Sequence, residues 1–245
     1  MFTATHTLHL LGYGRHAGLL LFVLSLCVTA GAQDAPEYRL ELGASAGLAA
    51  YQGDLNGNLL RGQKPAFGLL ARYKLNPRMA FALHIDHSRL SGSSDNVDTW
   101  MPAIAGQTYD FKSSVTGADV AFEYNCWPFG TGREYFGARH FTPFVTFGAG
   151  LVFAKATPTL NGRQSVAAFE TPFGLGVKYK VADRLNLIAA WTMHFSGTDR
   201  IDGLDDPYGI ESSGLFKNTD CYSTFRLSLS YDLWAKCRAC HNDDE

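Results

Sequence analysis

Hydrophobic and polar residues alternate one by one along much of this chain. Between Phe173 and Val181, apolar side chains occupy every second position, and glycine or lysine occupies the positions between them. Successive side chains of a β-strand point to opposite faces, so this stretch predicts a strand with one apolar and one polar face. The same alternation predicts further strands at residues 38–50, 66–75, 79–88, 109–125, 142–155, 185–196 and 222–233.

The connections between these strands alternate in length. Residues 76–78 and 182–184 predict tight turns, and 126–140 a longer connection on the same side. The connections on the opposite side are long, and 197–220 is the longest. Short periplasmic turns and long exterior loops are typical of outer-membrane barrels. We therefore predict an all-β protein, an eight-stranded antiparallel up-and-down transmembrane β-barrel with both ends in the periplasm. The alternation slips near Gly117, which predicts a β-bulge there.

The polar faces of the predicted strands consist mostly of Gly, Ser and Ala with a few charges. A barrel of eight strands is just wide enough for side chains to fill it. The charges are therefore predicted to pair inside and to plug the lumen, which argues against a pore. These residues are Arg39, Glu41, Arg72, Lys74, Asp86, Glu123, Lys178, Arg226 and Asp232. A soluble lipocalin-like barrel, with apolar side chains inside and polar ones outside, is the alternative.

Residues 1–32 predict a secretory signal peptide. Arg15 precedes a short apolar run at 19–24, and Ala30-Gly31-Ala32 fits a signal-peptidase site. A retained membrane anchor is the alternative, although the apolar run is short for one. The predicted barrel then occupies residues 33–234, and a cysteine-bearing periplasmic tail occupies 235–245. The net charge of -2 gives no basic excess that would indicate nucleic acid binding.

Several motifs follow one another along nearly all of the predicted mature chain. The two longest segments are residues 51–56, after the first predicted strand, and 172–179, at the sixth. The motif residues are Tyr51, Gly53, Asp54, Leu55, Asn56, Pro172, Gly174, Gly176, Lys178 and Tyr179. This ordered set resembles the PorG-like outer-membrane β-barrel family, which is associated with the type IX secretion system. The resemblance implies a barrel surrounded by outer-membrane lipid that works with the periplasmic ring of the secretion machine, built by the lipoprotein PorK and its partner PorN. The family also contains many barrels of unassigned role.

The cysteines suggest covalent chemistry at the periplasmic end. Cys237-Arg238-Ala239-Cys240-His241 has the spacing of a haem attachment motif, but no distal ligand or apolar pocket accompanies it. Cys126, Cys237 and Cys240 are predicted at the periplasmic end and Cys221 at the other, too far away for a disulfide. Three thiols allow one bridge and one spare. The hypothesis is that the spare thiol bonds to a periplasmic ring component.

His194 and Ser196 form a His-x-Ser pair like that of outer-membrane lipid A deacylases. Both are predicted to point into the lumen, away from lipid, so an enzyme that acts on lipid is a minor alternative. His84 and Asp86, with His87 beside them, are interpreted as polar lumen residues around a hydrogen-bonded pair rather than metal ligands. The acidic loop residues Asp202, Asp205, Asp206 and Glu211 lack a regular calcium-ligand spacing. No catalytic residue, metal or cofactor is predicted.

Two main functions follow. The first is a structural barrel that anchors or organises the type IX secretion apparatus through its periplasmic end. The second is a stand-alone surface barrel whose exterior loops bind a ligand or stabilise the envelope.

Overall fold

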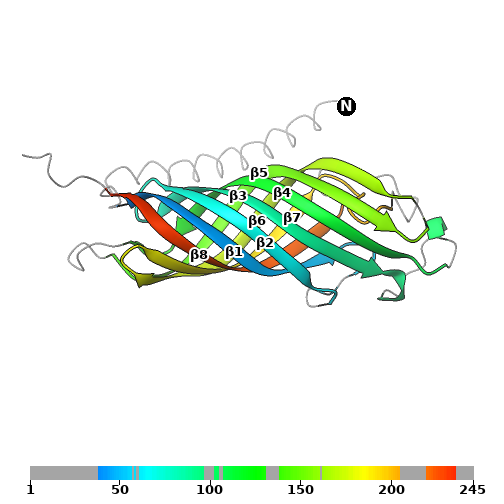
Figure 1. Ribbon diagram of the computed structural model, residues 1–245, viewed down its shortest axis with the longest axis horizontal. Coiled ribbons are helices and arrows are strands. Elements are labelled where there is room, and N and C mark those ends of the chain that lie inside the picture. Colours follow the sequence, from blue (N-terminus) through cyan, green and yellow to red (C-terminus); the bar gives the residue numbers. More distant parts are fainter. Residues whose placement is uncertain are drawn as a thin grey trace, which may run out of the picture. The chain divides into compact units, whose positions relative to one another are not determined.

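The computed structural model describes residues 38–56, 58, 61–96, 102–104, 107–130, 138–160, 162–204 and 219–235. Eight antiparallel strands close into one barrel, and β1 pairs with both β2 and β8 (Figure 1). The strands are β1 (Tyr38–Gln52), β2 (Lys64–Lys74), β3 (Met79–Ser93), β4 (Asp110–Asn125), β5 (Phe141–Pro158), β6 (Gln164–Ala182), β7 (Leu185–Ser196) and β8 (Cys221–Ala235). The predicted fold class is confirmed.

Two short 3-10 helices, η1 (Ser94–Asn96) and η2 (Pro102–Ile104), lie between β3 and β4. Within the described residues, no helix has the length and hydrophobicity needed to cross a membrane.

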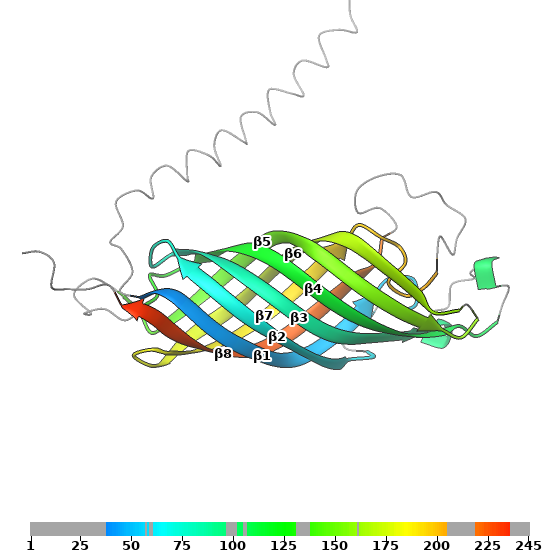
Figure 2. The ribbon, with the colours of Figure 1, turned by 45° about the horizontal axis from the view of Figure 1, so that its top comes forward.

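The strands run obliquely around the barrel (Figure 2). Paired residues can be followed once around the barrel, from Ala50 on β1 through Phe147 on β5 to Leu40, ten positions earlier on β1. Such a stagger is the geometric counterpart of strand tilt in a closed barrel. Side chains from many strands therefore meet inside, although they lie far apart in sequence.

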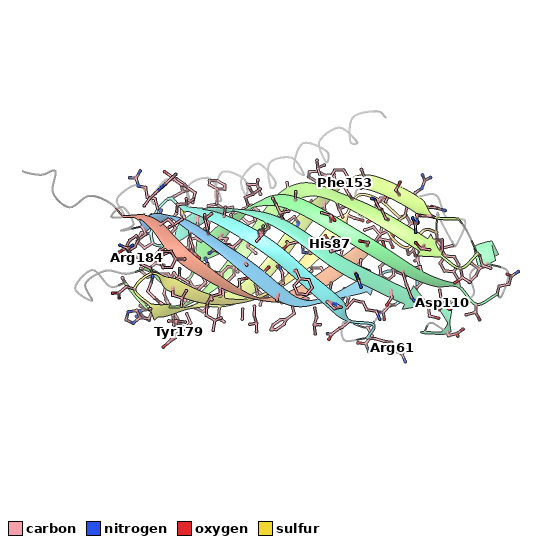
Figure 3. All side chains as sticks on the ribbon, in the orientation of Figure 1. Arg61, His87, Asp110, Phe153, Tyr179 and Arg184 are labelled. Carbon is pink, nitrogen blue, oxygen red and sulfur yellow. The ribbon has the colours of Figure 1, made fainter. Side chains whose placement is uncertain are left out.

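The outer surface of the barrel is apolar. Leu69 is 62% exposed and Phe147 is 56% exposed, and Figure 3 shows Phe153 and Tyr179 pointing away from the barrel wall. A continuous apolar belt of this kind is stable in contact with the acyl chains of a bilayer and unfavourable in contact with water. Antiparallel strands that close into a barrel leave no unpaired edge in lipid. The protein is therefore an outer-membrane β-barrel, and the lipocalin-like alternative is wrong because the charged side chains are the ones inside.

The two ends of the barrel differ in their connections. β1 begins opposite the end of β8, where Tyr38 pairs with Ala235, and the short turns between β2 and β3 and between β6 and β7 lie at this same end. Short turns face the periplasm in outer-membrane barrels, so we call this the periplasmic end and the other the exterior end. Figure 3 marks the periplasmic end with Arg184 and the exterior end with Arg61 and Asp110.

Several strands extend further toward the exterior than the alternation predicted. β3 continues to Ser93 and β6 begins at Gln164, whereas the predicted strands ended at 88 and began at 173. The predicted and observed bounds of β7 agree. At the exterior ends the strands leave the apolar belt, so their outward side chains become polar and the alternation weakens.

The predicted bulge near Gly117 is wrong. β4 pairs with β3 and β5 through this position without a register shift. Phe111 and Val115 are buried on the inward face, where they join a hydrophobic cluster. The slip in the sequence pattern is thus a change from a polar to an apolar interior. A register shift occurs instead between Lys180 and Ala182, where β6 pairs with β7.

The predicted signal peptide (1–32) and all of the predicted tail except Ala235 lie outside the described residues. Both remain predictions.

Candidate functional site

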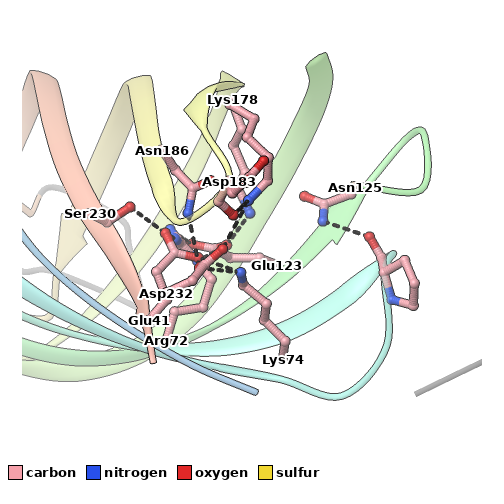
Figure 4. Close-up of polar contacts among 12 residues, drawn as sticks. Glu41, Arg72, Lys74, Glu123, Asn125, Lys178, Asp183, Asn186, Ser230 and Asp232 are labelled. Carbon is pink, nitrogen blue, oxygen red and sulfur yellow. Dashed lines mark hydrogen bonds and ion pairs between the residues drawn. The ribbon is translucent and has the colours of Figure 1, made fainter. Parts of the chain in front are cut away.

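Seven buried charged side chains gather inside the periplasmic half of the barrel (Figure 4). They come from five different strands, and each is at most 8% exposed. The members are Glu41, Arg72, Lys74, Glu123, Lys178, Lys180 and Asp232. We call this group the charge cluster. Strand alternation turns each of them inward, and the pairing of neighbouring strands brings them together.

Arg72 lies at the centre of the charge cluster. Its Nε and a terminal guanidinium nitrogen donate to the two carboxylate oxygens of Glu123 at 2.6 and 2.9 Å, and its other terminal nitrogen donates to Glu41. Lys178 Nζ lies 2.6 Å from the same Glu123 carboxylate. The planar fork of arginine matches a carboxylate with two parallel hydrogen bonds, which fixes geometry as well as charge.

Asp232 organises the other part of the charge cluster. Its carboxylate accepts hydrogen bonds from Lys74 Nζ at 2.5 Å, Lys180 Nζ at 2.9 Å and Asn186 Nδ2 at 3.0 Å. Lys74 Nζ also lies 3.1 Å from Glu41, so it links the two parts. Every carboxylate of the cluster contacts at least two cations, which is the arrangement that makes burial of charge tolerable.

Six of the nine predicted lumen charges belong to this cluster, and three do not. Arg39 was predicted inside but is exposed. Arg39 has the same inward parity as Glu41, but it is the second residue of β1. It therefore lies at the periplasmic rim, beyond the filled part of the interior. Asp86 and Arg226 form a separate ion pair. Lys180 already lies on the polar face of the predicted strand 173–181, with the same parity as Lys178, but it was not included among the predicted lumen charges.

The predicted lumen pair of His84 and Asp86 is also wrong. His84 Nδ1 lies 3.1 Å from Asp119 Oδ1, because Asp119 is its direct partner on β4. Directly opposed residues on neighbouring strands are closer than residues two apart on one strand. Asp86 pairs with Arg226 instead, and His87 is exposed on the outer face beside Thr116.

A second polar group, nearer the exterior, surrounds Glu170. Tyr222 donates a hydrogen bond of 2.7 Å to Glu170 Oε2, and His194 Nδ1 lies 3.5 Å from the same oxygen. The His194 and Tyr222 rings stack with centroids 4.4 Å apart. His194 and Ser196 both point inward as predicted. The Ser196 hydroxyl, however, donates to the Asp220 carbonyl at 2.6 Å, so it holds a loop in place.

Two buried carboxylates meet at the exterior end of the barrel. The Tyr51 hydroxyl lies 3.0 Å from Asp202 Oδ2 and also hydrogen-bonds to Asp220. The backbone N–H groups of Ile201 and Leu204 donate to Asp220 and Asp202, each at 2.8 Å. We call Tyr51, Asp202 and Asp220, with the loop residues they hold, the carboxylate cap.

The carboxylate cap sits against the exterior hydrophobic cluster. Tyr51 packs edge-on against Phe111 with ring centroids 4.9 Å apart, and the Tyr109 hydroxyl donates to the Asp202 carbonyl at 3.2 Å. Other buried members are Leu55, Leu90, Val115, Ile201 and Leu204. This cluster fills the exterior half of the barrel, as the charge cluster fills the periplasmic half.

Burial raises the pKa of Asp202 to about 7. Burial, and then the neighbouring Asp202 charge, raise the pKa of Asp220 well above its ordinary value. A phenol has one proton, so Tyr51 can donate to only one of the two carboxylates it contacts. A proton on the Asp pair would supply the other hydrogen bond, and the raised pKa values favour that arrangement.

The first family motif forms part of the carboxylate cap. Gly53 lies so close to it that an added Cβ would collide with the Tyr51 hydroxyl and stand 2.8 Å from Asp220 Oδ1. Leu55 is fully buried, and Asn56 donates to the Tyr51 carbonyl at 2.9 Å. Asp54 follows Gly53 in the same short turn. Neither the motif nor the strand alternation predicts that this segment contacts residues about 150–170 positions later.

The second family motif lies on β6. Pro172, Gly174, Gly176 and Lys178 share its inward face, while Tyr179 is 52% exposed on the outside. A Cβ on Gly176 would stand 2.8 Å from the Phe144 ring, over which Lys178 Nζ lies at 4.4 Å from the centroid. Gly176 thus makes room for the ring that supports a charge-cluster lysine.

Two of the mature cysteines are described, and both are free thiols. Cys126 is exposed at the periplasmic end, and Cys221 is half-buried at the exterior end. Cys237 and Cys240 lie outside the described residues, so their pairing remains a prediction. Among the described side chains, no group of three or more His, Cys, Asp or Glu is placed to hold a metal ion. Asp205, Asp206 and Glu211 are outside the described residues.

Residues 17–242 match the family model described as "Domain of unknown function (DUF6089)". The chain belongs to this family. No curated protein matches the sequence.

Solved outer-membrane proteins resemble the DUF6089 chain. Neisserial surface protein A (NspA) is 18% identical with a TM-score of 0.46, covering 79% of this chain and 97% of its own. Ail of Yersinia pestis, in complex with the heparin analogue sucrose octasulfate, is 14% identical with a TM-score of 0.44, covering 80% and 99%. OprG of Pseudomonas aeruginosa is 11% identical with a TM-score of 0.41, covering 82% and 99%.

Proposed function

We propose that this protein is a closed structural barrel that anchors a periplasmic assembly to the outer membrane, and is neither a channel nor an enzyme. The observation that supports this is the filled interior. The charge cluster blocks the periplasmic half, and the hydrophobic cluster with the carboxylate cap blocks the exterior half. A barrel that conducts nothing acts through its two ends and its outer wall.

Conductance across a planar bilayer tests the closed interior. The wild-type protein is expected to give no discrete channel steps. The double variant Arg72→Ser/Glu123→Ser removes both side chains of the central ion pair and opens space inside the charge cluster. It serves as the positive control, which is expected to conduct ions. Its folding is checked by the gel shift that intact barrels show before heating. Steady channel steps from the wild type would contradict the proposal.

The finer proposal is that the assembly is the periplasmic ring of the type IX secretion system, with PorK and PorN as the partners. It is supported by the ordered motifs of the PorG-like family and by an exposed aromatic surface on the connection between β4 and β5. Trp127 on this connection is 37% exposed and Phe141, the first residue of β5, is 41% exposed, with ring centroids 5.8 Å apart. The Arg139 guanidinium lies 5.2 Å from the Trp127 centroid. Large aromatic and arginine side chains are the residue types that dominate protein interfaces.

Mild crosslinking followed by pull-down of the barrel tests the partner. Wild-type barrel is expected to recover the ring lipoprotein, and Trp127→Ala is expected to reduce that recovery at least several-fold. Phe153→Ala, which removes an aromatic side chain from the lipid-facing wall far from the periplasmic end, is the matched control and should recover the ring unchanged. Repeated absence of the lipoprotein from wild-type samples would contradict the secretion role.

The cysteines make a separate part of this proposal. We propose that an exposed periplasmic thiol, with Cys126 as the described candidate, bonds to the ring component. Non-reducing gels of cells that carry the whole machine should show a slower band that Cys126→Ser removes. An unchanged monomer band would exclude the covalent link.

The second candidate is a stand-alone surface barrel that stabilises the envelope or binds a ligand outside. The packed exterior cap favours it, because an ordered exterior end is not needed for a purely periplasmic role. In that case deletion would weaken the envelope while secretion continued normally.

A further inference from the structure

The outer wall of the barrel carries cations on three adjacent strands that form no ion pair with any described residue. Arg89 on β3, Lys112 on β4 and Lys155 on β5 are exposed and have outward parity. Arg89 pairs with Ser114 across β3 and β4, and Ser114 pairs with Lys155 across β4 and β5. Lys112 is two positions further along β4. The register thus places all three side chains within one small area of the wall.

These cations lie just beyond the exterior edge of the apolar belt. On β3, Ile85 is 50% exposed, and Arg89 follows four residues later toward the exterior. On β5, Phe153 is 51% exposed and Lys155 follows two residues later. An apolar belt marks the acyl chains, so side chains just beyond it lie at the level of the lipid headgroups.

The cations inside and outside the barrel differ in their partners. Inside, the charge-cluster cations all contact carboxylates. Outside, Arg89, Lys112 and Lys155 form no ion pair with any residue that the structure describes. Among the described strand residues, the outward faces of β1, β2, β6, β7 and β8 carry no Lys or Arg in their exterior halves. The positive charge is therefore confined to one side of the wall.

A hollow of about 600 Å³ adjoins this area at the exterior end. Its lining includes Arg61, Lys64 and Lys112, together with the ring of Phe111 and Pro158. Asp110 is the acidic residue among the lining side chains. The hollow thus adds two cations beside buried apolar residues, and Lys112 belongs to both the hollow and the wall.

We propose that this wall and hollow bind the phosphorylated saccharide headgroup of an outer-leaflet glycolipid. The arginine fork and the lysine ammonium groups are complementary to phosphate. The position of these cations just beyond the belt matches a headgroup whose acyl chains lie against the same strands. The apolar residues that line the hollow suit the less polar face of a sugar ring. This inference does not depend on the secretion role.

Binding of a bisphosphorylated lipid A and of its phosphate-free form to the full-length barrel in nanodiscs tests the proposal. Surface cations contribute roughly fivefold each to binding of anionic lipid, so Arg89→Ser/Lys112→Ser/Lys155→Ser should weaken binding of the phosphorylated form on the order of 100-fold. Arg39→Ser, which removes an exposed cation at the periplasmic end, is the matched control and should bind as the wild type does. The exchange Arg89→Lys/Lys112→Arg/Lys155→Arg keeps the charge and should retain most of the affinity.

Three outcomes would overturn the proposal. Equal binding of the phosphorylated and phosphate-free lipids by the wild type would show that phosphate is not recognised. Unchanged binding by the triple serine variant, with its barrel confirmed as folded, would show that these cations are not the site. Competition by inorganic phosphate at the same concentration as the lipid would assign the site to free phosphate and not to a headgroup.

Discussion

The two halves of the barrel interior bury carboxylates in different ways. In the periplasmic half, Glu41, Glu123 and Asp232 each contact two or more cations. In the exterior half, Asp202 and Asp220 meet through the Tyr51 hydroxyl and accept hydrogen bonds from backbone N–H groups. The first half compensates buried charge with opposite charge, whereas burial in the second half raises the carboxyl pKa values.

This difference separates a permanent part of the molecule from an adjustable one. The ion pairs of Arg72 with Glu41 and Glu123 keep their charges across the physiological pH range, because arginine does not lose its proton there. A buried carboxylate pair that holds a proton instead depends on pH, because the proton leaves as the pH rises. The periplasmic half is therefore expected to fix the barrel, and the carboxylate cap to respond to the medium outside the cell.

The largest expected effect comes from breaking the permanent half. Arg72→Ala removes the fork on Glu123 and the contact with Glu41, and leaves two buried carboxylates with fewer cations. Removing one partner of a buried ion pair typically costs about 3–5 kcal/mol. We expect the free energy of unfolding to fall by about that amount, measured by urea unfolding of the barrel in lipid vesicles.

Two variants sharpen this result. Arg39→Ala removes an exposed arginine from the neighbouring strand and should change the unfolding free energy by less than about 0.5 kcal/mol. Arg72→Lys keeps the charge but loses the fork, so it should fall between wild type and Arg72→Ala. If all three variants unfolded alike, the cluster would not be what holds the periplasmic half together.

The sequence pattern was sufficient for the architecture because the relevant signal is local. Alternation along each strand fixed which side chains face inward, and so it identified Arg72, Lys178 and Asp232 without a structure. The partner of each charge was not predictable, since it depends on the pairing of strands that are distant in sequence. His84 shows this, because its partner Asp119 lies on another strand.

The carboxylate cap escaped prediction for the same reason. Tyr51 and Asp220 are 169 residues apart, and neither segment indicates that the other is its partner. The alternation was also misleading at Gly117. The inward side chains change there from polar to apolar, so the sequence pattern of a regular strand was interpreted as a bulge. A family motif was the one sequence signal for this region, and it marked Gly53 and Tyr51 without saying what they contact.

A smaller effect is expected from removing the shared donor of the cap. Tyr51→Phe keeps the packing against Phe111 but leaves the two carboxylates without the hydroxyl between them. An unsatisfied buried polar group costs about 1–3 kcal/mol. The loop should open more often, which hydrogen exchange of the Ile201 and Leu204 amides would detect. Tyr179→Phe, which removes a hydroxyl from the outer wall, should leave those amides unchanged, and equal exchange in both variants would exclude Tyr51 as the element that holds the cap.

The smallest effect is a slope in the pH dependence of the closed cap. An aspartate in an open loop loses its proton near pH 4, whereas in the closed cap Asp202, with its pKa raised to about 7, keeps it. The closed state thus binds more protons between these values, and its stability falls as the pH rises from about 4 to 7. The fall is at most about 1.4 kcal/mol per pH unit for each retained proton.

Asp202→Asn keeps an acceptor for the Leu204 amide but cannot titrate. Its cap should therefore lose much of this slope, and the Leu204 amide should be more protected from exchange than in the wild type at pH 7 to 8. Asp110→Asn, which neutralises an exposed carboxylate nearby, is the control that should retain the wild-type slope. Exchange rates corrected for the intrinsic effect of pH measure the difference, and parallel slopes for wild type and Asp202→Asn would show that the proton is not held there.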